Sequence, residues 1–250
     1  ITPYTTYVKG SPVVDGGYPV EIVAPNFIDV NGNYTFSTTN GVINVNPRLI
    51  TFTVQNATAV YDENFVPSST TVTVKFDESR LVGTDTIEDI TATGAAPTFE
   101  YSTDFRYIDN YKVGTYYIKA TPNFATSPNY AVESAQGVLT VTKAHLVIKA
   151  DDITLEYGSP IPADIEDAYS VVGAKRNETA EEVVSSGSIK IDTTYEKNSP
   201  VNMEGYPITV DVTNAVFDNY TVSVQHGTIT VINDCGYAMN TNYTGNRYLK

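Results

Sequence analysis

Two adjacent pairs of acidic residues are the first candidates for chemistry in this sequence. They are Asp62 with Glu63 and Asp151 with Asp152. Carboxylate oxygens are the ligands that Ca²⁺ prefers in proteins. Each pair lies shortly after a short joint between two of the segments described below. We therefore expect these residues either to bind calcium between neighbouring modules or to form solvated acidic turns. Calcium is the only cofactor that the sequence suggests.

Tyrosine is the second candidate, because its ring is apolar and its hydroxyl group forms hydrogen bonds. The chain contains 19 tyrosines and no tryptophan. Tyr101, Tyr107 and Tyr111 surround Phe105 and do not recur elsewhere at a fixed interval. We consider these three residues as candidates for a strip that binds a glycan or a partner protein. The absence of tryptophan weakens the glycan interpretation.

Residues typical of catalysis are few and scattered. Cys235 is the single cysteine, which excludes an internal disulfide and a metal site with several cysteines. It predicts either an intermolecular disulfide or a free thiol. His145 and His226 lie at different places relative to the repeats described below, so we interpret them as surface or turn residues. No phosphate-binding loop and no nucleophile elbow is present. We therefore expect a protein that is not an enzyme.

The composition restricts the class of partner. The formal net charge is −14, which disfavours binding to nucleic acid. No stretch approaches 18 consecutive apolar residues, so we expect no membrane insertion in this segment. Hydrophobic residues make up 41% and charged residues 18% of the chain, which favours a folded protein over a disordered one. β-Branched and aromatic residues occur throughout the chain and favour strands.

The elements that must position these candidates recur along the chain. An Asn-Tyr pair is followed by an alternating apolar run and, eight residues after the Asn, by a glycine. Alternation with period two is typical of a half-buried strand. The recurring tyrosines are expected to be core or corner residues. The three copies begin at Asn33-Tyr34, Asn129-Tyr130 and Asn219-Tyr220, with glycines at Gly41, Gly137 and Gly227.

The recurring glycines are separated by 96 and 90 residues, and a second recurring element has a spacing of 96 residues. An alternating run precedes Tyr61 and another precedes Tyr157. The period predicts complete repeats over 47–142 and 143–233, the second half of a repeat over 1–46, and a polar tail over 234–250. Each complete repeat offers about six to eight short strands, which predicts an antiparallel β-sandwich. One helical turn is expected in each, over 85–90 and 177–184. The fold class is therefore all-β, with tandem immunoglobulin-like sandwiches and very short joints that favour a rod.

These motifs resemble a known family. The segments Tyr157-Gly158-Ser159-Pro160, Val113-Gly114-Thr115-Tyr116 and Gly137-Val138-Leu139-Thr140-Val141 resemble the MBG-type repeats of bacterial surface proteins. Tyr61-Asp62 departs from the usual Tyr-Gly. The resemblance implies tandem β-sandwich modules in secreted or wall-attached adhesin-like proteins, and it implies no catalytic site. It also implies an extracellular location, with neighbouring modules and host or matrix glycans or proteins as partners.

The half repeat leaves alternatives open. Half a sandwich exposes an apolar face and unpaired strand edges. Either the chain is a fragment of a longer protein, or another subunit donates the missing strands, with residues 234–250 as one source of the donor. We expect a stalk or fibre segment that holds distal domains away from the cell. The alternatives are a self-assembling filament subunit and a glycan- or protein-binding module.

Overall fold

The computed structural model describes residues 2–23 and 31–233 of the 250-residue chain. Strands dominate this part of the chain, and its helical elements are three short 3₁₀ turns: η1 (Glu78–Arg80), η2 (Ile87–Ile90) and η3 (Ile165–Asp167). The expected all-β class is confirmed, and several sheets consistent with a β-sandwich are present. In these residues no helix is long and apolar enough to span a bilayer.

The chain forms two compact units, each described by itself. Unit 1 contains the described residues of Ile1–Ala57, Val66–Phe105 and Tyr116–Leu139. Unit 2 contains those of Thr58–Phe65, Arg106–Thr115 and Thr140–Lys250. Two short segments from the middle of the chain, 58–65 and 106–115, therefore pack with the C-terminal part of the chain.

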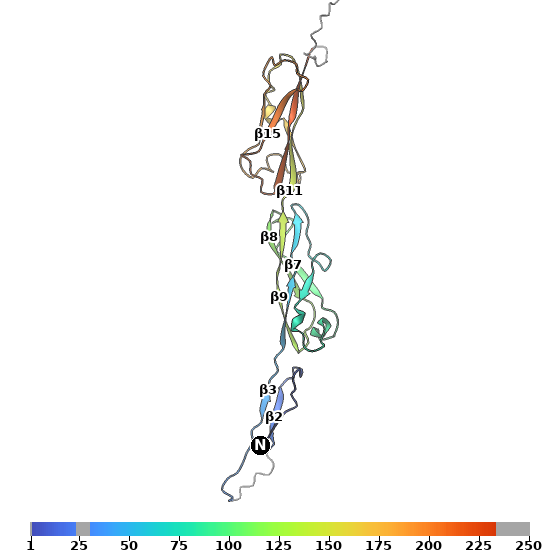
Figure 1. The fold of residues 1–250 in the computed structure, drawn as a ribbon, viewed down its shortest axis with the longest axis vertical. Helices are drawn as coiled ribbons and strands as arrows, with labels where there is room; N and C mark the ends of the chain where they lie inside the picture. Colours follow the sequence, from blue (N-terminus) through green and yellow to red (C-terminus); the bar gives the residue numbers. More distant parts are fainter. Residues whose placement is uncertain (1, 24–30, 234–250) are drawn as a thin grey trace, which may run out of the picture. The chain divides into compact units, whose positions relative to one another are not determined.

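A three-stranded antiparallel sheet begins unit 1. It has the order β1-β2-β3 and consists of β1 (Thr2–Tyr4), β2 (Tyr18–Val23) and β3 (Gly41–Ile43). The side chains of this sheet are exposed or half-buried. Figure 1 shows β2 and β3 side by side.

A second three-stranded sheet, in the order β6-β4-β9, carries the core of unit 1. β4 is antiparallel to β6 and parallel to β9, and its residues alternate as expected for a strand with one buried face. Ile50 and Phe52 point inward, whereas Thr51 and Thr53 are exposed. The strands are β4 (Arg48–Val54), β6 (Val74–Phe76) and β9 (Tyr130–Ala135).

The corresponding sheet of unit 2 has the order β13-β11-β16. β11 is antiparallel to β13 and parallel to β16, as β4 is to β6 and β9. The strands are β11 (Ala144–Ala150), β13 (Tyr169–Val172) and β16 (Tyr220–Gln225).

Two four-stranded sheets have their strands in corresponding orders, β5-β10-β8-β7 and β12-β17-β15-β14. Their strands are β5 (Ala57–Val60), β7 (Phe99–Thr103), β8 (Gly114–Pro122), β10 (Gly137–Thr142), β12 (Ile153–Glu156), β14 (Lys190–Thr193), β15 (Tyr206–Asp211) and β17 (Gly227–Ile232).

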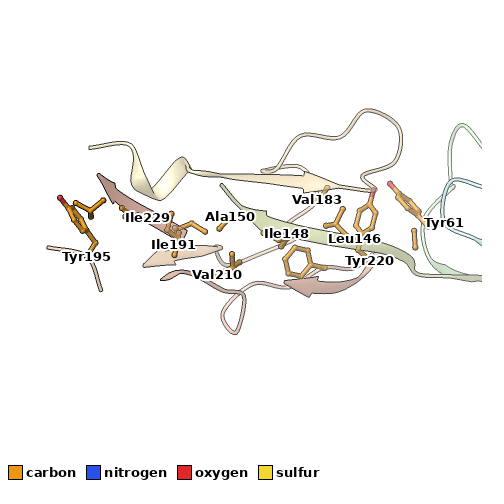
Figure 2. Close-up of a cluster of buried hydrophobic side chains, with 14 of the residues drawn as sticks. Tyr61, Leu146, Ile148, Ala150, Val183, Ile191, Tyr195, Val210, Tyr220 and Ile229 are labelled. Carbon is orange, nitrogen blue, oxygen red and sulfur yellow. The ribbon is translucent and has the colours of Figure 1, made fainter. Parts of the chain in front are cut away.

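The core of unit 2 is a cluster of aliphatic side chains with tyrosines at its ends. Figure 2 shows Tyr195 at one end, Ile148 and Val210 in the middle, and Tyr61 facing Tyr220 at the other. β-Branched and aliphatic residues fill the space between the strands, which removes their apolar surface from water.

Two local expectations concern helical turns. The helical turn expected over 85–90 is present as η2, and the Asp89 side chain accepts hydrogen bonds from Thr86, which lower the pKa of Asp89.

The helical turn expected over 177–184 is present as a single hydrogen-bonded turn, in which the Val183 N–H donates to the Thr179 carbonyl oxygen (3.2 Å). The Thr179 N–H donates to Glu182 Oε2 (2.8 Å), and the Glu182 N–H donates to Thr179 Oγ1 (3.3 Å). The turn begins after Asn177, because Arg176 and Asn177 have φ angles of 54° and 58°, in the left-handed region that a right-handed helix does not use.

Candidate functional site

Tyr220 is the anchor of the most connected side-chain cluster in unit 2. It begins β16 and is buried. Its hydroxyl group accepts a hydrogen bond from the Lys175 N–H (2.8 Å) and donates one to Glu178 Oε2. A buried phenol needs such partners. The tyrosine thereby fixes the turn over 175–178, whose left-handed residues would otherwise be costly.

Tyr61 joins this cluster from the end of β5. Its N–H donates to the Thr142 carbonyl oxygen (2.8 Å), and its side chain is only 1% exposed. Its ring meets the Tyr220 ring edge to face, with 5.3 Å between centroids, and its hydroxyl group donates to Glu178 Oε1 (2.6 Å). One carboxylate therefore binds two buried tyrosines. Burial, and second the hydrogen bond to Glu178, raise the pKa of Tyr61 and that of Tyr220.

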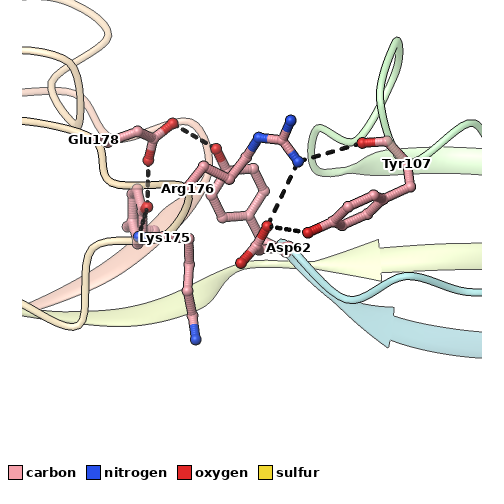
Figure 3. A network of polar contacts seen from close by, with 7 residues as sticks. Asp62, Tyr107, Lys175, Arg176 and Glu178 are labelled. Carbon is pink, nitrogen blue, oxygen red and sulfur yellow. Dashed lines mark hydrogen bonds and ion pairs between the residues drawn. The ribbon is translucent and has the colours of Figure 1, made fainter.

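Arg176 forms the outer part of the cluster. Its guanidinium carbon lies 3.9 Å from the centre of the Tyr111 ring and 5.1 Å from that of Tyr107. Its Nη1 donates to the Tyr107 carbonyl oxygen (3.4 Å) and lies 3.6 Å from Asp62 Oδ1. The Tyr107 hydroxyl group donates to the same Asp62 oxygen (2.9 Å), which raises the pKa of Tyr107. Figure 3 shows the hydrogen bonds and the ion pair among Arg176, Asp62 and Tyr107.

We call the seven residues Tyr61, Asp62, Tyr107, Tyr111, Arg176, Glu178 and Tyr220 the tyrosine clamp. They come from three separate segments of the chain, 58–65, 106–115 and 140–233, all within unit 2. The side chains of Arg176 and Asp62 are 26% and 24% exposed, so their ion pair is partly shielded from water. Shielding strengthens a charge pair and a cation–π contact relative to an exposed one. The clamp therefore holds three backbone segments together.

Unit 1 contains the same anchor. The Tyr130 hydroxyl group accepts a hydrogen bond from the Val82 N–H (3.0 Å) and donates to Asp85 Oδ2 (2.6 Å). Tyr130 is 3% exposed, and burial raises its pKa. The expectation of a buried tyrosine is thus confirmed for Tyr130 and Tyr220. It is wrong for Tyr34, which is 74% exposed.

The Asn that precedes each buried tyrosine has a recurring role as well. Asn129 Oδ1 accepts a hydrogen bond from the Val13 N–H (2.7 Å) in unit 1. Asn219 Oδ1 accepts one from the Val113 N–H (3.2 Å) in unit 2. In both units the Asn-Tyr pair therefore combines a core tyrosine with an amide that binds the backbone of an earlier segment.

Three of the four calcium candidates use their carboxylates in other contacts, and for Asp151 the contact is one of the backbone. Asp62 lies in the tyrosine clamp with Arg176. Glu63 Oε2 accepts from the Val60 N–H (2.9 Å), and Asp152 Oδ1 accepts from the Thr228 N–H (2.9 Å). The Asp151 N–H donates to the Ala168 carbonyl oxygen (2.9 Å). Within residues 2–23 and 31–233, no three His, Cys, Asp or Glu side chains lie close enough together to hold a metal ion.

The three partner-binding candidates have different surroundings. Tyr107 and Tyr111 both contact Arg176 and are half-buried. Tyr101 lies in β7, where its ring centroid is 6.3 Å from that of Phe99. Our sequence reasoning missed Arg176 and Glu178 as site residues. The available signal was weak: Lys175 and Arg176 are the one adjacent pair of basic residues in the chain.

The two histidines form local contacts near strands of unit 2. His145 lies in β11, and its Nε2 is 3.3 Å from Ser223 Oγ. His226 Nδ1 accepts a hydrogen bond from the Val210 N–H (3.0 Å), which is a structural contact between strands. Cys235 and the rest of the 234–250 tail lie outside the described residues.

Comparison with known proteins adds no family to this description. No protein-family model matches the chain, and a search of curated proteins finds no relative.

Proposed function

We propose that this chain is a structural stalk or fibre segment of an extracellular, bacterial, adhesin-like surface protein. In this proposal it is built from tandem immunoglobulin-like β-sandwich modules of the MBG type, which form a rod and hold distal domains away from the cell. The modules are the predicted repeats 47–142 and 143–233. The role is mechanical and needs neither a catalytic site nor a cofactor.

The tyrosine clamp is the single observation that carries the proposal. The boundary between the two predicted repeats falls at 142 and 143, yet segments 58–65 and 106–115 pack with residues C-terminal to it. A stalk must resist bending at each joint, and a loose linker provides little resistance. A joint that contains buried aromatic rings, a carboxylate bound by two tyrosines and a partly shielded ion pair resists bending more strongly.

Small-angle X-ray scattering of the full chain tests this proposal. We expect the wild type to scatter as an extended particle of narrow cross-section. Tyr61→Ala, which removes the central ring of the clamp, should allow bending and shorten the maximum dimension. Tyr157→Ala is the matched control, because Tyr157 follows β12 as Tyr61 follows β5 but is 59% exposed. A compact wild type, or equal scattering from all three proteins, would contradict the proposed role.

The glycan- or protein-binding alternative receives less support. The rings of Tyr107 and Tyr111 are already in contact with Arg176 within unit 2.

A further inference from the structure

A polar pocket on the β5-β10-β8-β7 sheet has no part in the tyrosine clamp. Its volume is about 260 Å³, and we call it the Tyr117 pocket. All the residues that line it belong to unit 1. They are Ser102, Thr103, Asp104, Tyr117, Lys119 and Gln136.

The strand pattern turns three of these side chains toward solvent. Tyr117 and Lys119 are exposed, whereas Ile118 between them is buried. Ser102 lies opposite Lys119 in the pairing of β7 with β8 and is also exposed. Figure 1 labels β7 and β8 in this sheet. The three exposed residues therefore share one face of the strand pair.

The backbone of Tyr117 holds Asp104 at one side of the pocket. The Tyr117 N–H donates to Asp104 Oδ1 (2.5 Å), and the Asp104 N–H donates to the Tyr117 carbonyl oxygen (3.3 Å). Tyr117 itself is 50% exposed. A positioned carboxylate therefore lies next to a tyrosine that is open to solvent.

The strand frame beneath the pocket recurs in unit 2. Thr103 Oγ1 donates to the Tyr117 carbonyl oxygen, and Thr193 Oγ1 donates to the Pro207 carbonyl oxygen, both at 2.8 Å. Each threonine oxygen also accepts a hydrogen bond from the N–H two residues further along, at 3.1 Å and 3.2 Å. These contacts join the two strands in both units and therefore belong to the fold.

The side chains that line the pocket differ at the equivalent positions of unit 2. The threonine contacts align β7 and β8 with β14 and β15, and Gln136 and His226 each precede a recurring glycine. The strand pair of unit 2 therefore forms without the aromatic ring, amine, carboxylate and amide that unit 1 has here. The pairs are Tyr117 with Pro207, Lys119 with Thr209, Asp104 with Thr194, and Gln136 with His226.

The chemistry of these four groups suits a neutral saccharide. The face of an aromatic ring packs against the C–H groups of a sugar ring. Asp104 accepts hydrogen bonds from hydroxyl groups, Lys119 donates them, and Gln136 does both. One acidic and one basic group in the same pocket disfavour a ligand with strong charge of either sign. The pocket is smaller than the range of about 300–1,000 Å³ that holds drug-sized ligands, which favours a single sugar ring.

We propose that the Tyr117 pocket binds one ring of a neutral saccharide. The proposal goes beyond the stalk role and does not depend on it. It also differs from the strip of Tyr101, Tyr107 and Tyr111 considered from the sequence, because none of these three residues lines the pocket.

Saturation-transfer difference NMR of the full chain tests the proposal. The probes are the methyl glycosides of glucose, galactose, mannose and N-acetylglucosamine, each at about 5 mM, because a ligand with so few contacts should have a Kd on the order of 1 mM. We expect saturation transfer to the ring protons of at least one probe. The methyl glycoside of glucuronic acid, which is the carboxylate counterpart of the glucose probe, should receive less.

Tyr117→Thr is the main variant, because it removes the exposed ring and keeps a residue that favours strands in β8. It should weaken binding about tenfold. Tyr157→Thr is the matched control, since Tyr157 is also an exposed tyrosine but does not line the pocket. Gln136→Ala should weaken binding about fivefold through the loss of hydrogen bonds. Circular dichroism checks that all three variants are folded.

Binding that needs Tyr117 and Gln136 but not Tyr157 would support the proposal. No transfer to any neutral probe, or the strongest transfer to the glucuronic acid probe, would overturn it. Binding that Tyr117→Thr leaves unchanged, or that Tyr157→Thr weakens equally, would overturn it as well. None of these outcomes bears on the scattering of the clamp variants, so the stalk role is judged separately.

Discussion

The surroundings of Tyr220 and Tyr130 differ although the two tyrosines are anchored alike. Each phenol accepts a hydrogen bond from a backbone N–H and donates one to an acidic side chain three residues further along. Beside Tyr220 the ring of Tyr61 fills the adjoining space, whereas beside Tyr130 that space is a cleft. The comparison teaches that the anchor is built by one set of strands, while the ring that covers it comes from another segment.

The residues at the equivalent positions 176 and 83 also differ between the two units. Arg176 follows the residue whose N–H binds Tyr220, and Gly83 follows the residue whose N–H binds Tyr130. The arginine side chain covers two tyrosine rings, and the glycine leaves its surroundings open. The surroundings of Tyr220 and Tyr130 thus differ by a few side chains, although the backbone hydrogen bonds to the two tyrosines are the same.

Removing the covering ring is expected to have the largest effect. Tyr61→Ala deletes a buried ring and leaves Glu178 without one of its two donors, which should cost about 3–5 kcal/mol of unfolding free energy in unit 2. Native-state hydrogen exchange of the β11 amides measures that loss. Tyr157→Ala should change the same quantity by less than about 0.5 kcal/mol, since its ring is 59% exposed. Equal losses of unfolding free energy in Tyr61→Ala and Tyr157→Ala would contradict the stabilising role of the Tyr61 ring beside Tyr220.

The recurring glycines provide the next largest difference. Gly227→Ala forces a Cβ against the Asp151 carbonyl oxygen and should destabilise unit 2 by about 1–3 kcal/mol. Among residues 2–23 and 31–233, a Cβ atom at Gly41 meets only the Val20 Cβ, at 3.7 Å, so Gly41→Ala should be neutral or stabilising by up to about 1 kcal/mol, because it restricts the unfolded chain. Thermal unfolding followed by circular dichroism at low protein concentration compares the two. A loss at Gly41 as large as that at Gly227 would show that its space is not open.

Arg176 should matter less than Tyr61. Arg176→Gln removes the contacts with two rings and the ion pair with Asp62, which should cost about 1 kcal/mol. Arg106→Gln is the matched control, because Arg106 pairs with Asp109 in an exposed i,i+3 contact and should contribute almost nothing. Urea denaturation of both variants measures the difference. If both variants lower the unfolding free energy by the same amount, the partly shielded Arg176–Asp62 pair contributes no more to stability than the exposed Arg106–Asp109 pair.

The smallest effect near neutral pH concerns the buried phenols. Tyr61 and Tyr220 have pKa values raised above the ordinary 10.0, so the folded state retains protons that the unfolded chain releases. Below pH 10 both states are protonated and the contribution to stability is complete. Above pH 10 the unfolding free energy should fall steadily with pH. Urea denaturation between pH 8 and 11 checks this, with Tyr61→Phe as a variant expected to show a shallower fall.

Much of the fold was predictable from periodic residues. Alternation in Ile50, Phe52 and Val54 predicts a strand with one buried face, and β4 has that face. The recurrence of Gly137 and Gly227 marks equivalent positions, and both lie against backbone.

The first residue of the turn expected over 177–184 was not predictable, because Asn177 and Thr179 are both capping residues followed by acidic ones. The turn begins at Thr179. The left-handed residues Arg176 and Asn177 before it lie between Lys175 and Glu178, which both bind Tyr220, 45 residues away from Lys175.

The candidate site was predictable only in part. Tyr107 and Tyr111 were singled out because they do not recur, and they lie in the clamp. Asp62 was singled out for calcium, and it lies against Arg176. Sequence patterns indicate which residues are acidic or aromatic, but they do not indicate that Arg176, which is 69 residues from Tyr107 and more than 100 from Asp62, packs against both.

The sequence by itself determined the all-β class, the strand faces and the recurring Asn-Tyr and glycine positions. These features follow from local properties, namely alternation of apolar residues, β-branched side chains and the special geometry of glycine. The tertiary structure alone decided that Glu178 binds two tyrosines, that Arg176 covers two rings and that Gly227 lies against the Asp151 carbonyl oxygen. Each of these depends on segments distant in sequence meeting in space, where burial and shielding set the strength of every contact.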